Sequence, residues 1–183
     1  MSKERRSKSR SRRSEYTQSH LATLHPLNPQ RFQFFTSIAT APKGTGYTLF
    51  AASRLFFQYL PAPYTVERLE AVTWAMDNDG FWDAKIKNLP LVVRHPLHNT
   101  PCVRWHEPWD ASKTKFSTCE VTIENDSQGI VELVDQLLYD RRVCLRFTWE
   151  QGDILLSDNV AMLHTRTAFT GDCDRELWRI HFD

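Results

Sequence analysis

The stretch GDILLSDNVAMLHTRTAF, Gly152–Phe169, decides how this chain is interpreted. It places His164 a few residues after an Asp-Asn turn, within sequence that is otherwise typical of a β-strand. Two arginines, Arg175 and Arg179, follow this histidine at spacings of 11 and 15 residues. A single histidine in a strand is usually a partly buried imidazole that bonds to a backbone carbonyl. The rest of the sequence must therefore show whether His164 belongs to a functional site.

The last predicted strand, residues 175–182, gives the first additional indication. Period-two alternation puts one set of side chains on one face, Arg175, Leu177, Arg179 and His181, and the other set on the opposite face, Glu176, Trp178, Ile180 and Phe182. The second face is mostly apolar and can pack on a helix or a sheet. On the first face the two arginines are about 13 Å apart, at roughly 3.3 Å per residue. Arginines that point inward need an anion or carboxylates to meet them, whereas the alternative is a solvated face.

Composition indicates one folded domain. The chain has 183 residues, of which 41% are hydrophobic and 12% aromatic, and its formal net charge is +1. That charge gives no overall field that would attract nucleic acid or a membrane surface. No 18-residue apolar run occurs, and the basic start lacks the apolar segment of a signal peptide, so we expect no membrane association. The four cysteines form no Cys-x-x-Cys pair, and we expect reduced, mostly buried thiols in a cytoplasmic protein.

Residues 1–19, MSKERRSKSRSRRSEYTQS, form a basic arm rich in Ser and Arg. This composition cannot bury enough apolar surface to offset the entropy of ordering, so we predict that the arm is disordered. It could be an RNA-binding or nuclear-targeting tail, a solvated terminus without a role, or the product of a misassigned first exon. Nothing else in the sequence supports binding to nucleic acid, and we do not expect it. We place the folded domain at residues 20–183.

Short strands dominate the predicted domain. We predict strands at 31–40, 47–51, 89–96, 101–109, 142–149, 153–157, 160–166 and 175–182, with 89–96 and 101–109 paired across a turn at His98-Asn99. We predict helices at 53–61, where Ser53 opens the helix, at 65–76, and at 127–142. The last has the clearest helical period, in Ile130, Leu133, Val134, Leu137 and Leu138. This mainly β pattern favours a sandwich or barrel with added helices.

The residues from Gly152 to Phe169, followed by Arg175 and Arg179, closely resemble the C-terminal signature of the TauD/TfdA-type Fe(II)- and 2-oxoglutarate-dependent dioxygenases. The segment from Pro42 to Phe50 resembles that family's Pro-x-x-Gly-Gly-x-Thr-x-Phe motif, in the same order along the chain. The Arg-His-Pro and Glu-Pro-Trp pieces between these blocks are most similar to the branch near isonitrile-forming dioxygenases. The resemblance covers roughly Pro26 to Asp183. It implies a double-stranded β-helix, or jelly roll, which is incomplete if the chain is truncated.

The resemblance also implies roles for particular residues. His164 matches the distal iron-binding histidine, and Arg175 matches the arginine that pairs with the C5 carboxylate of 2-oxoglutarate. Thr48 matches the threonine that hydrogen-bonds this carboxylate, and Arg179 matches an arginine that can hold an anionic substrate group. Ferrous iron that activates O₂ takes two imidazoles and one carboxylate, and a planar guanidinium suits a planar carboxylate. We expect Asp158 and Asn159 to stabilise the turn before His164 through bonds to the backbone, and not to be ligands.

The family's other two iron ligands form a His-x-Asp motif, and this sequence contains no His-x-Asp. His20 could stand for the proximal histidine, with Ala22 in place of the aspartate. Three explanations remain open: a halide site opened by alanine, as in related iron halogenases; a degenerate, metal-free paralogue; or a truncated or mis-started chain. His25 is a poorer ligand candidate. His106 and Glu107 are interpreted as strand-end or pocket-lining residues.

The sequence therefore predicts Fe(II)/2-oxoglutarate-dependent oxidation of a small organic acid or amino-acid-derived metabolite, with O₂ and a small-molecule substrate as partners. The expected metal ligands are His164 and His20, the expected cosubstrate contacts Thr48 and Arg175, and the expected substrate contact Arg179. No residue is assigned as an acid, base or nucleophile. The alternative is an inactive, truncated or degenerate paralogue that acts as a binding module with a residual anion pocket.

Overall fold

The computed structural model describes residues 30–79, 84–109, 118–125, 129–168 and 175–183. The predicted basic arm at 1–19 and the domain boundary at residue 20 lie outside these residues. The same holds for His20, Ala22, His25 and Cys173. Of the three cysteines within the described ranges, Cys102 and Cys119 are buried, Cys144 is half-buried, and all are free thiols.

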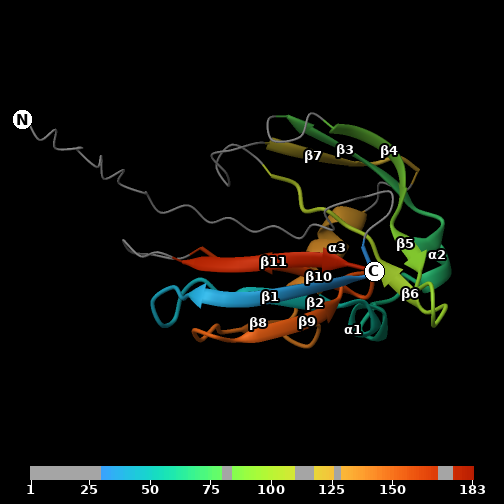
Figure 1. The fold of residues 1–183 in the computed structure, drawn as a ribbon. Helices are drawn as coiled ribbons and strands as arrows, with labels where there is room; N and C mark the ends of the chain where they lie inside the picture. The colour runs from blue at the N-terminus through green and yellow to red at the C-terminus, as the bar shows by residue number, and fades with distance from the viewer. Residues whose placement is uncertain (1–29, 80–83, 110–117, 126–128, 169–174) are drawn as a thin grey trace, which may run out of the picture.

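Two antiparallel sheets form the part of the molecule that contains His164. The first has the order β11-β1-β9 and consists of β1 (Phe32–Ala39), β9 (Ile154–Asp158) and β11 (Glu176–Phe182). The second has the order β10-β2-β8 and consists of β2 (Thr48–Ala52), β8 (Cys144–Phe147) and β10 (Met162–Arg166). From β8 to β11, each successive strand lies in the opposite sheet. Figure 1 shows the strands of both sheets running close together.

Alternating residues of β1 explain why these two sheets pack together. Gln33, Phe35 and Ser37 are buried, whereas the residues between them are only half-buried. Phe35 makes an edge contact with Phe50 of β2, with ring centroids 6.0 Å apart, and a tilted contact with Trp149, at 6.2 Å. These three aromatic side chains are the buried centre of a small core between the sheets. Tight aromatic packing therefore fixes which residues of each strand face the interior.

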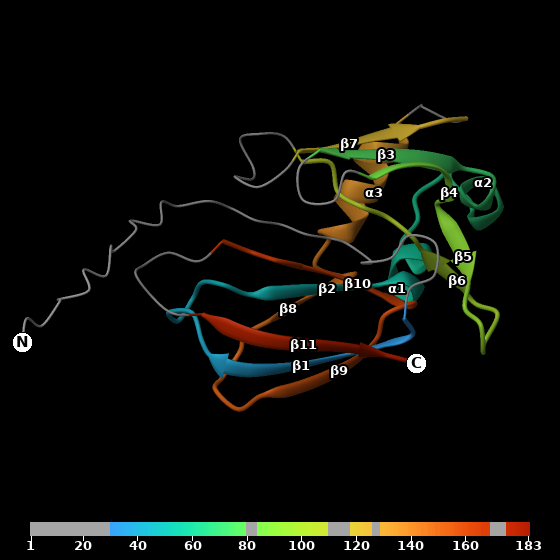
Figure 2. The ribbon, with the colours of Figure 1, turned by 45° about the horizontal axis from the view of Figure 1, so that its top comes forward.

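The other elements build a larger core beside this pair of sheets. A third sheet, β4-β3-β7, comprises β3 (Thr73–Asp79), β4 (Ala84–Pro90) and β7 (Thr118–Ile123). The hairpin of β5 (Val92–Arg94) and β6 (Pro101–Val103) is flanked by α1 (Ser53–Gln58) and α2 (Val66–Glu70). In Figure 2, α3 (Ile130–Leu138) lies between the third sheet and the layer of β2 and β10. None of the three helices in the described ranges is long and apolar enough to cross a membrane.

Most predicted elements are confirmed. All five apolar residues that define the predicted period of α3 are buried, and β5 pairs with β6 across the expected turn. The predicted strand at 89–96 is divided between β4, which ends at Pro90, and β5. Ser53 is the first residue of α1, but its hydroxyl accepts a hydrogen bond from the Val103 amide, at 3.0 Å, and does not cap the helix.

The helix predicted at 65–76 is wrong in its second half. Only Val66–Glu70 is helical, and β3 begins at Thr73. The side chains of Val72, Trp74 and Met76 alternate with less buried neighbours, and β3 lies between β4 and β7. The apolar spacing of this segment also fits a helix. It forms a strand because a central strand buries these side chains and suits β-branched and aromatic residues.

The outer face of β11 does not pack as predicted. Trp178, Ile180 and Phe182 are 58%, 58% and 40% exposed. Within the described part of the chain, this apolar face is therefore open to solvent.

Candidate functional site

The candidate site lies between the two sheets, where β1 and β11 face β10 and β2. Strand pairing places Arg179 beside Phe35 and His164 beside Phe50. The rings of Phe35 and His164 meet edge to face, with centroids 5.3 Å apart. Because paired residues of adjacent strands share a face, His164 and Arg179 lie on the sides of their sheets that face each other, His164 buried and Arg179 still exposed to solvent.

His164 is 8% exposed and has a polar partner at each ring nitrogen. Its Nδ1 lies 3.2 Å from Nε2 of Gln33, which is fully buried on β1. Its Nε2 lies 3.2 Å from a terminal guanidinium nitrogen of Arg179, which donates to it. Desolvation lowers the pKa of Arg179 from its ordinary value. The imidazole of His164 therefore belongs to a polar cluster with Gln33 and Arg179, next to the aromatic rings of Phe35 and Phe50.

Thr48, the predicted cosubstrate contact, also faces this interior. Its side chain is 4% exposed and its hydroxyl accepts a hydrogen bond from the indole Nε1 of Trp149 at 2.7 Å. Trp149 in turn packs on Phe35. A hydroxyl that accepts one bond still has its own proton to donate. Thr48 can therefore donate to a carboxylate while Trp149 holds its oxygen in place.

Arg175 directly precedes β11 and is half-buried. The first residues of β11 pair with Ser37 and Ala39, at the end of β1 that also bonds to the turn at Gly152 and Asp153. That turn follows Trp149, the partner of Thr48. Arg175 and Thr48 thus lie toward the same end of the two sheets, while His164 and Arg179 lie further along them.

The interior between these sheets is rich in basic groups. Arg166 occupies the interior-facing position of β10 that pairs with Thr48. No Asp or Glu stands at the interior-facing paired positions of the six strands. Desolvation, followed by the charge of Arg179, lowers the pKa of the neighbouring His181. Such a surface is suited to an organic anion, because desolvated guanidinium groups need negative partners.

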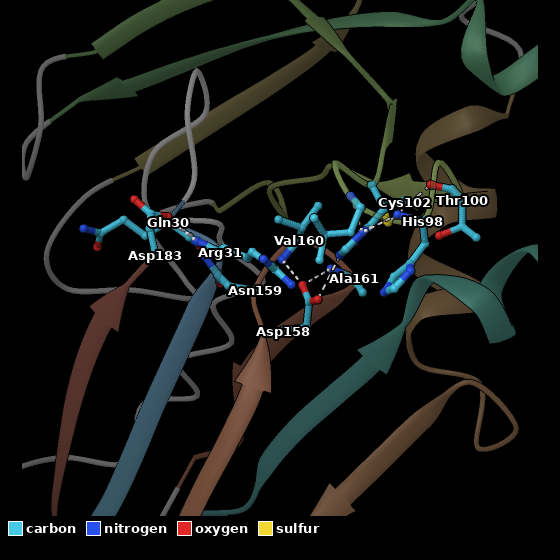
Figure 3. Close-up of polar contacts among 12 residues, drawn as sticks. Gln30, Arg31, His98, Thr100, Cys102, Asp158, Asn159, Val160, Ala161 and Asp183 are labelled. Carbon is cyan, nitrogen blue, oxygen red and sulfur yellow. Dashed lines mark hydrogen bonds and ion pairs between the residues drawn. The ribbon is translucent and has the colours of Figure 1, made fainter.

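The turn between β9 and β10 is fixed by Asp158, as predicted. Its Oδ1 accepts from the backbone amides of Val160 and Ala161, at 2.9 and 3.1 Å, and its Oδ2 accepts from His95 Nε2 at 2.9 Å. The side-chain amide of Asn159 donates to the carbonyl of Gln30 at 2.9 Å. Figure 3 shows Asp158 at the end of β9, between these turn amides and the hairpin that carries His98 and Thr100. This network holds the start of the strand that bears His164.

His106 and Glu107 lie apart from this network and are satisfied by local partners. Nδ1 of His106 donates to the carbonyl of Glu107 at 2.8 Å and lies 3.4 Å from the Cys119 thiol, while Glu107 accepts from Tyr139 at 2.9 Å. Burial lowers the pKa of His106 to about 4, so that its imidazole is neutral near pH 7. These contacts agree with the structural role expected for the pair.

The described residues do not by themselves fit a ferrous ion. Ferrous iron for oxygen activation takes two imidazoles and a carboxylate, but among residues 30–183, gaps excepted, no group of three His, Cys, Asp or Glu side chains is arranged to hold a metal. His164 is the single predicted ligand that these residues contain, and its Nε2 is occupied by Arg179. His20, the other predicted ligand, lies outside them.

Sequence reasoning missed three residues that define this region. Gln33 contacts His164, Arg166 faces the interior, and His95 bonds to Asp158. Alternation along FQFFTSIA could have identified Gln33 as a polar residue on the apolar face of β1. The same alternation along MLHTR places Arg166 on the face of His164. The contact between His95 and Asp158 joins residues 63 positions apart, and no local pattern indicates it.

Similar proteins agree with this geometry. A curated relative, isocyanide synthase xanB of Aspergillus fumigatus, is 72% identical over 155 residues, which are 85% of this chain and 20% of that protein. The chain thus spans about a fifth of that relative's length. The solved structure of PvcB from Pseudomonas aeruginosa matches with a TM-score of 0.67 and 22% identity, over 93% of this chain and 58% of that one. A taurine dioxygenase from Burkholderia xenovorans matches with a TM-score of 0.68 and 22% identity, over 90% of this chain and 56% of that one.

These structural matches confirm the jelly-roll fold of TauD-type dioxygenases. The family model described as "Taurine catabolism dioxygenase TauD, TfdA family" matches residues 2–181, nearly the whole chain. The chain belongs to the TauD/TfdA family of dioxygenases.

Proposed function

We propose that this chain forms part of an Fe(II)/2-oxoglutarate-dependent oxygenase that acts on a small organic acid or an amino-acid-derived metabolite. The observation that carries the proposal is the buried, interior-facing position of His164 on β10, the position of the family's distal iron-binding histidine, in a chain of the TauD/TfdA family. The basic interior and the half-satisfied hydroxyl of Thr48 support it, because both suit a dicarboxylate cosubstrate.

Binding and orientation are the roles that the described residues can perform. Arg175 pairs with the far carboxylate of 2-oxoglutarate through two parallel N–H donors, and the hydroxyl of Thr48 donates to the same carboxylate. Arg179 contacts an anionic group of the substrate. The aromatic groups of Phe35, Phe50 and Trp149 exclude water from this end of the interior. When bound, ferrous iron would supply the activation of O₂, with ligands beyond those of the described residues.

We propose isonitrile metabolism as the setting. The relative at 72% identity is named an isocyanide synthase, and a further PvcB structure, at a TM-score of 0.65, is titled an Fe, alpha-ketoglutarate dependent oxygenase from an isonitrile synthetic pathway. On this basis the substrate is an amino-acid-derived isonitrile or its precursor. An isonitrile carries little charge of its own, so the substrate's amino-acid carboxylate is the group suited to Arg179.

A second candidate is a non-catalytic module that retains the anion pocket. It is favoured by the lack of a His-x-Asp motif in the sequence and of a three-ligand group in the described residues. Both the oxygenase and the non-catalytic module bind an anion, but only the oxygenase turns over 2-oxoglutarate.

Formation of succinate from 2-oxoglutarate distinguishes the oxygenase from the non-catalytic module. The assay compares the chain with Ala22→Asp, which creates a His-x-Asp motif at His20, in the presence of Fe(II), ascorbate and O₂. The oxygenase proposal expects Ala22→Asp to form more succinate than the unmodified chain, and His164→Ala in that background to abolish the gain. Binding of N-oxalylglycine without any succinate would favour the module. Neither binding nor succinate would contradict both.

A further inference from the structure

His95, the residue after β5, has a side chain whose hydrogen-bonding direction is fixed by its own turn. Its Nδ1 accepts from the backbone amides of Leu97 and His98, at 3.2 and 3.3 Å. A backbone amide can only donate, so Nδ1 carries a lone pair and the ring proton lies on Nε2. Nε2 donates to Oδ2 of Asp158, 2.9 Å away. The turn of the β5–β6 hairpin thus aims the ring donor at the turn between β9 and β10.

Asp158 extends this contact to the start of β10. Its Oδ1 accepts from the backbone amides of Val160 and Ala161, the two residues that directly precede β10 at Met162. One carboxylate therefore joins the hairpin to both of these residues (Figure 3). Three N–H donors from fixed directions leave such a carboxylate little freedom to rotate.

A second connection joins the same hairpin to the same turn through Ser53. The backbone amide of Ser53 donates to the carbonyl of Ala161 at 2.9 Å, and its hydroxyl accepts from the amide of Val103 on β6 at 3.0 Å. Ser53 and Val103 are both buried. Each strand of the hairpin is therefore connected to the residues before β10, β5 through His95 and β6 through Ser53.

We propose that His95 is a positioning residue, whose Nε2–H holds Asp158 and thereby the start of β10, the strand that carries His164. Ala161 lies three residues before His164 on an extended chain, so a displaced turn would displace the imidazole as well. His95 is 3% exposed, and water has little access to replace its donor. The role of His164 as an iron ligand belongs to the proposed function, and the proposal rests on it in this respect alone.

Two substitutions at residue 95 separate the two bonds of the ring. The side-chain oxygen of asparagine lies close to the position of Nδ1, so His95→Asn keeps the acceptor for the Leu97 and His98 amides and loses the donor to Asp158. The amide nitrogen of glutamine lies close to the position of Nε2, so His95→Gln keeps that donor and loses the local acceptor. A residue that acts through Asp158 should be replaceable by glutamine and not by asparagine.

Amide hydrogen exchange in the full chain, followed by NMR, measures how firmly the turn is held. We expect exchange at Val160 and Ala161 to become more than about tenfold faster in His95→Asn, because a bond to a charged group is lost, and to change less than about threefold in His95→Gln. The carboxyl of Asp158 gives a second signal. Burial raises its pKa, and the bond from His95 is the largest of the contacts that lower it, so the pKa should rise in His95→Asn only.

His98→Asn is the matched control. It makes the same substitution in the same turn, at an exposed side chain that stacks on the His95 ring with centroids 4.7 Å apart, and keeps the backbone amide. It should leave the exchange at Val160 and Ala161 unchanged. Faster exchange in both variants of residue 95 would assign the effect to the local turn and overturn the proposal, as would unchanged exchange in both. If His95→Asn does not fold, nitrogen-15 signals of His95 in the unmodified chain decide, and a protonated Nδ1 would overturn it.

These measurements need no ligand, so their outcome is distinct from that of the proposed function. In the Ala22→Asp background we expect His95→Asn to lower succinate formation and His95→Gln to retain it. An Ala22→Asp chain that forms no succinate would contradict the proposed function and leave the contacts of His95 standing. Equal succinate formation in His95→Asn and His95→Gln would overturn the positioning role and leave the proposed function standing.

Discussion

At the scale of single residues, the site depends on buried polar side chains that satisfy one another. Thr48 and Trp149 are one such pair. The buried indole N–H of Trp149 donates to the Thr48 hydroxyl at 2.7 Å. A buried donor that loses its acceptor keeps the cost of desolvation without compensation. Residues that bind ligand in this interior are therefore also expected to contribute to stability.

Replacement of Thr48 by valine tests this dual role. The change keeps the shape of the side chain but leaves the Trp149 N–H unpaired, so we expect a loss of about 1–3 kcal/mol in the free energy of unfolding. Urea denaturation measures the loss. Thr122→Val is the matched control, because Thr122 is exposed on β7, and should change stability by less than about 0.5 kcal/mol. Equal effects of the two changes would contradict the role of the Thr48 hydroxyl.

Iron binding is also decided by individual residues. His164 without a second imidazole and a carboxylate cannot hold ferrous iron well, and the sequence has no His-x-Asp motif to supply them. We therefore expect weak or undetectable binding in an anaerobic Fe(II) titration of the unmodified chain. Stoichiometric, micromolar binding that is lost in His20→Ala would show that Ala22 does not prevent binding, and would support a halogenase-like site.

At the scale of elements, the turn between β9 and β10 links the strand of His164 to the β5–β6 hairpin. Burial alone would raise the pKa of Asp158, but the bond from His95 and the amides of Ala161 and Val160 outweigh it and lower the pKa below its ordinary value. A carboxyl whose pKa is lower in the folded state stabilises the fold above its unfolded pKa, near 4. That stabilisation is lost as the pH falls through the folded pKa.

Asp158→Ala should accordingly destabilise the chain in a pH-dependent way. At pH 7 we expect a loss of about 2 kcal/mol, from three broken hydrogen bonds to a carboxylate. The difference between Asp158→Ala and the unmodified chain should shrink as the pH falls through the lowered folded pKa of Asp158, where the native carboxyl also becomes protonated. Denaturation midpoints at several pH values measure this. Asp77→Asn, which alters an exposed ion pair with Lys85, serves as the control and should cost less than about 1 kcal/mol. A difference that does not vary with pH would contradict the assignment.

Elements with one dominant period could be predicted from the sequence. The apolar positions of α3 fit only a helix, and the alternation of β11 separated the half-buried Leu177 and His181 from the exposed Trp178, Ile180 and Phe182, although Arg179 is also exposed. The apolar residues of 65–76 fit the period of a helix as well as that of a strand. The second half forms β3 because it is buried between β4 and β7. Gln33 and His95 carry no motif, since their importance comes from partners that are distant in sequence. The family resemblance supplied His164, Thr48 and Arg179 but could not show that Arg179 bonds to His164.

At the scale of the whole molecule, the outer face of the β11-β1-β9 sheet gathers five exposed large hydrophobic side chains among the described residues: Ile154, Leu156, Trp178, Ile180 and Phe182. Register places Ile180, Phe34 and Leu156 in one row across the three strands, and Trp178, Thr36 and Ile154 in the next. The exposed fractions of Leu156 and Ile154 are 62% and 69%. A contiguous surface of this kind favours self-association.

Lysine at the centre of this face should reduce association and leave the fold intact. We expect Leu156→Lys/Ile180→Lys to bind less of the dye ANS and to give a larger monomer fraction by light scattering. Because both side chains are exposed, the free energy of unfolding should change by less than about 1 kcal/mol. Lysine at Glu132, an exposed polar position on α3, is the control. Unchanged dye binding in the double variant would show that this face is not accessible in solution.

Calorimetric binding of N-oxalylglycine, an unreactive analogue of 2-oxoglutarate, tests most directly whether the space between the two sheets is a cosubstrate pocket. We expect the unmodified chain to bind it and Arg175→Ala to lose more than tenfold in affinity, or about 2 kcal/mol, because a bidentate carboxylate contact is removed. Arg179→Ala should lose less. Arg146→Ala, on the outer face of β8 over the ring of Tyr47, should bind as the unmodified chain does. Equal losses of affinity in Arg175→Ala and Arg179→Ala, or a larger loss in Arg179→Ala, would show that the roles of the two arginines are assigned wrongly. Failure of the unmodified chain to bind N-oxalylglycine would contradict the existence of the pocket.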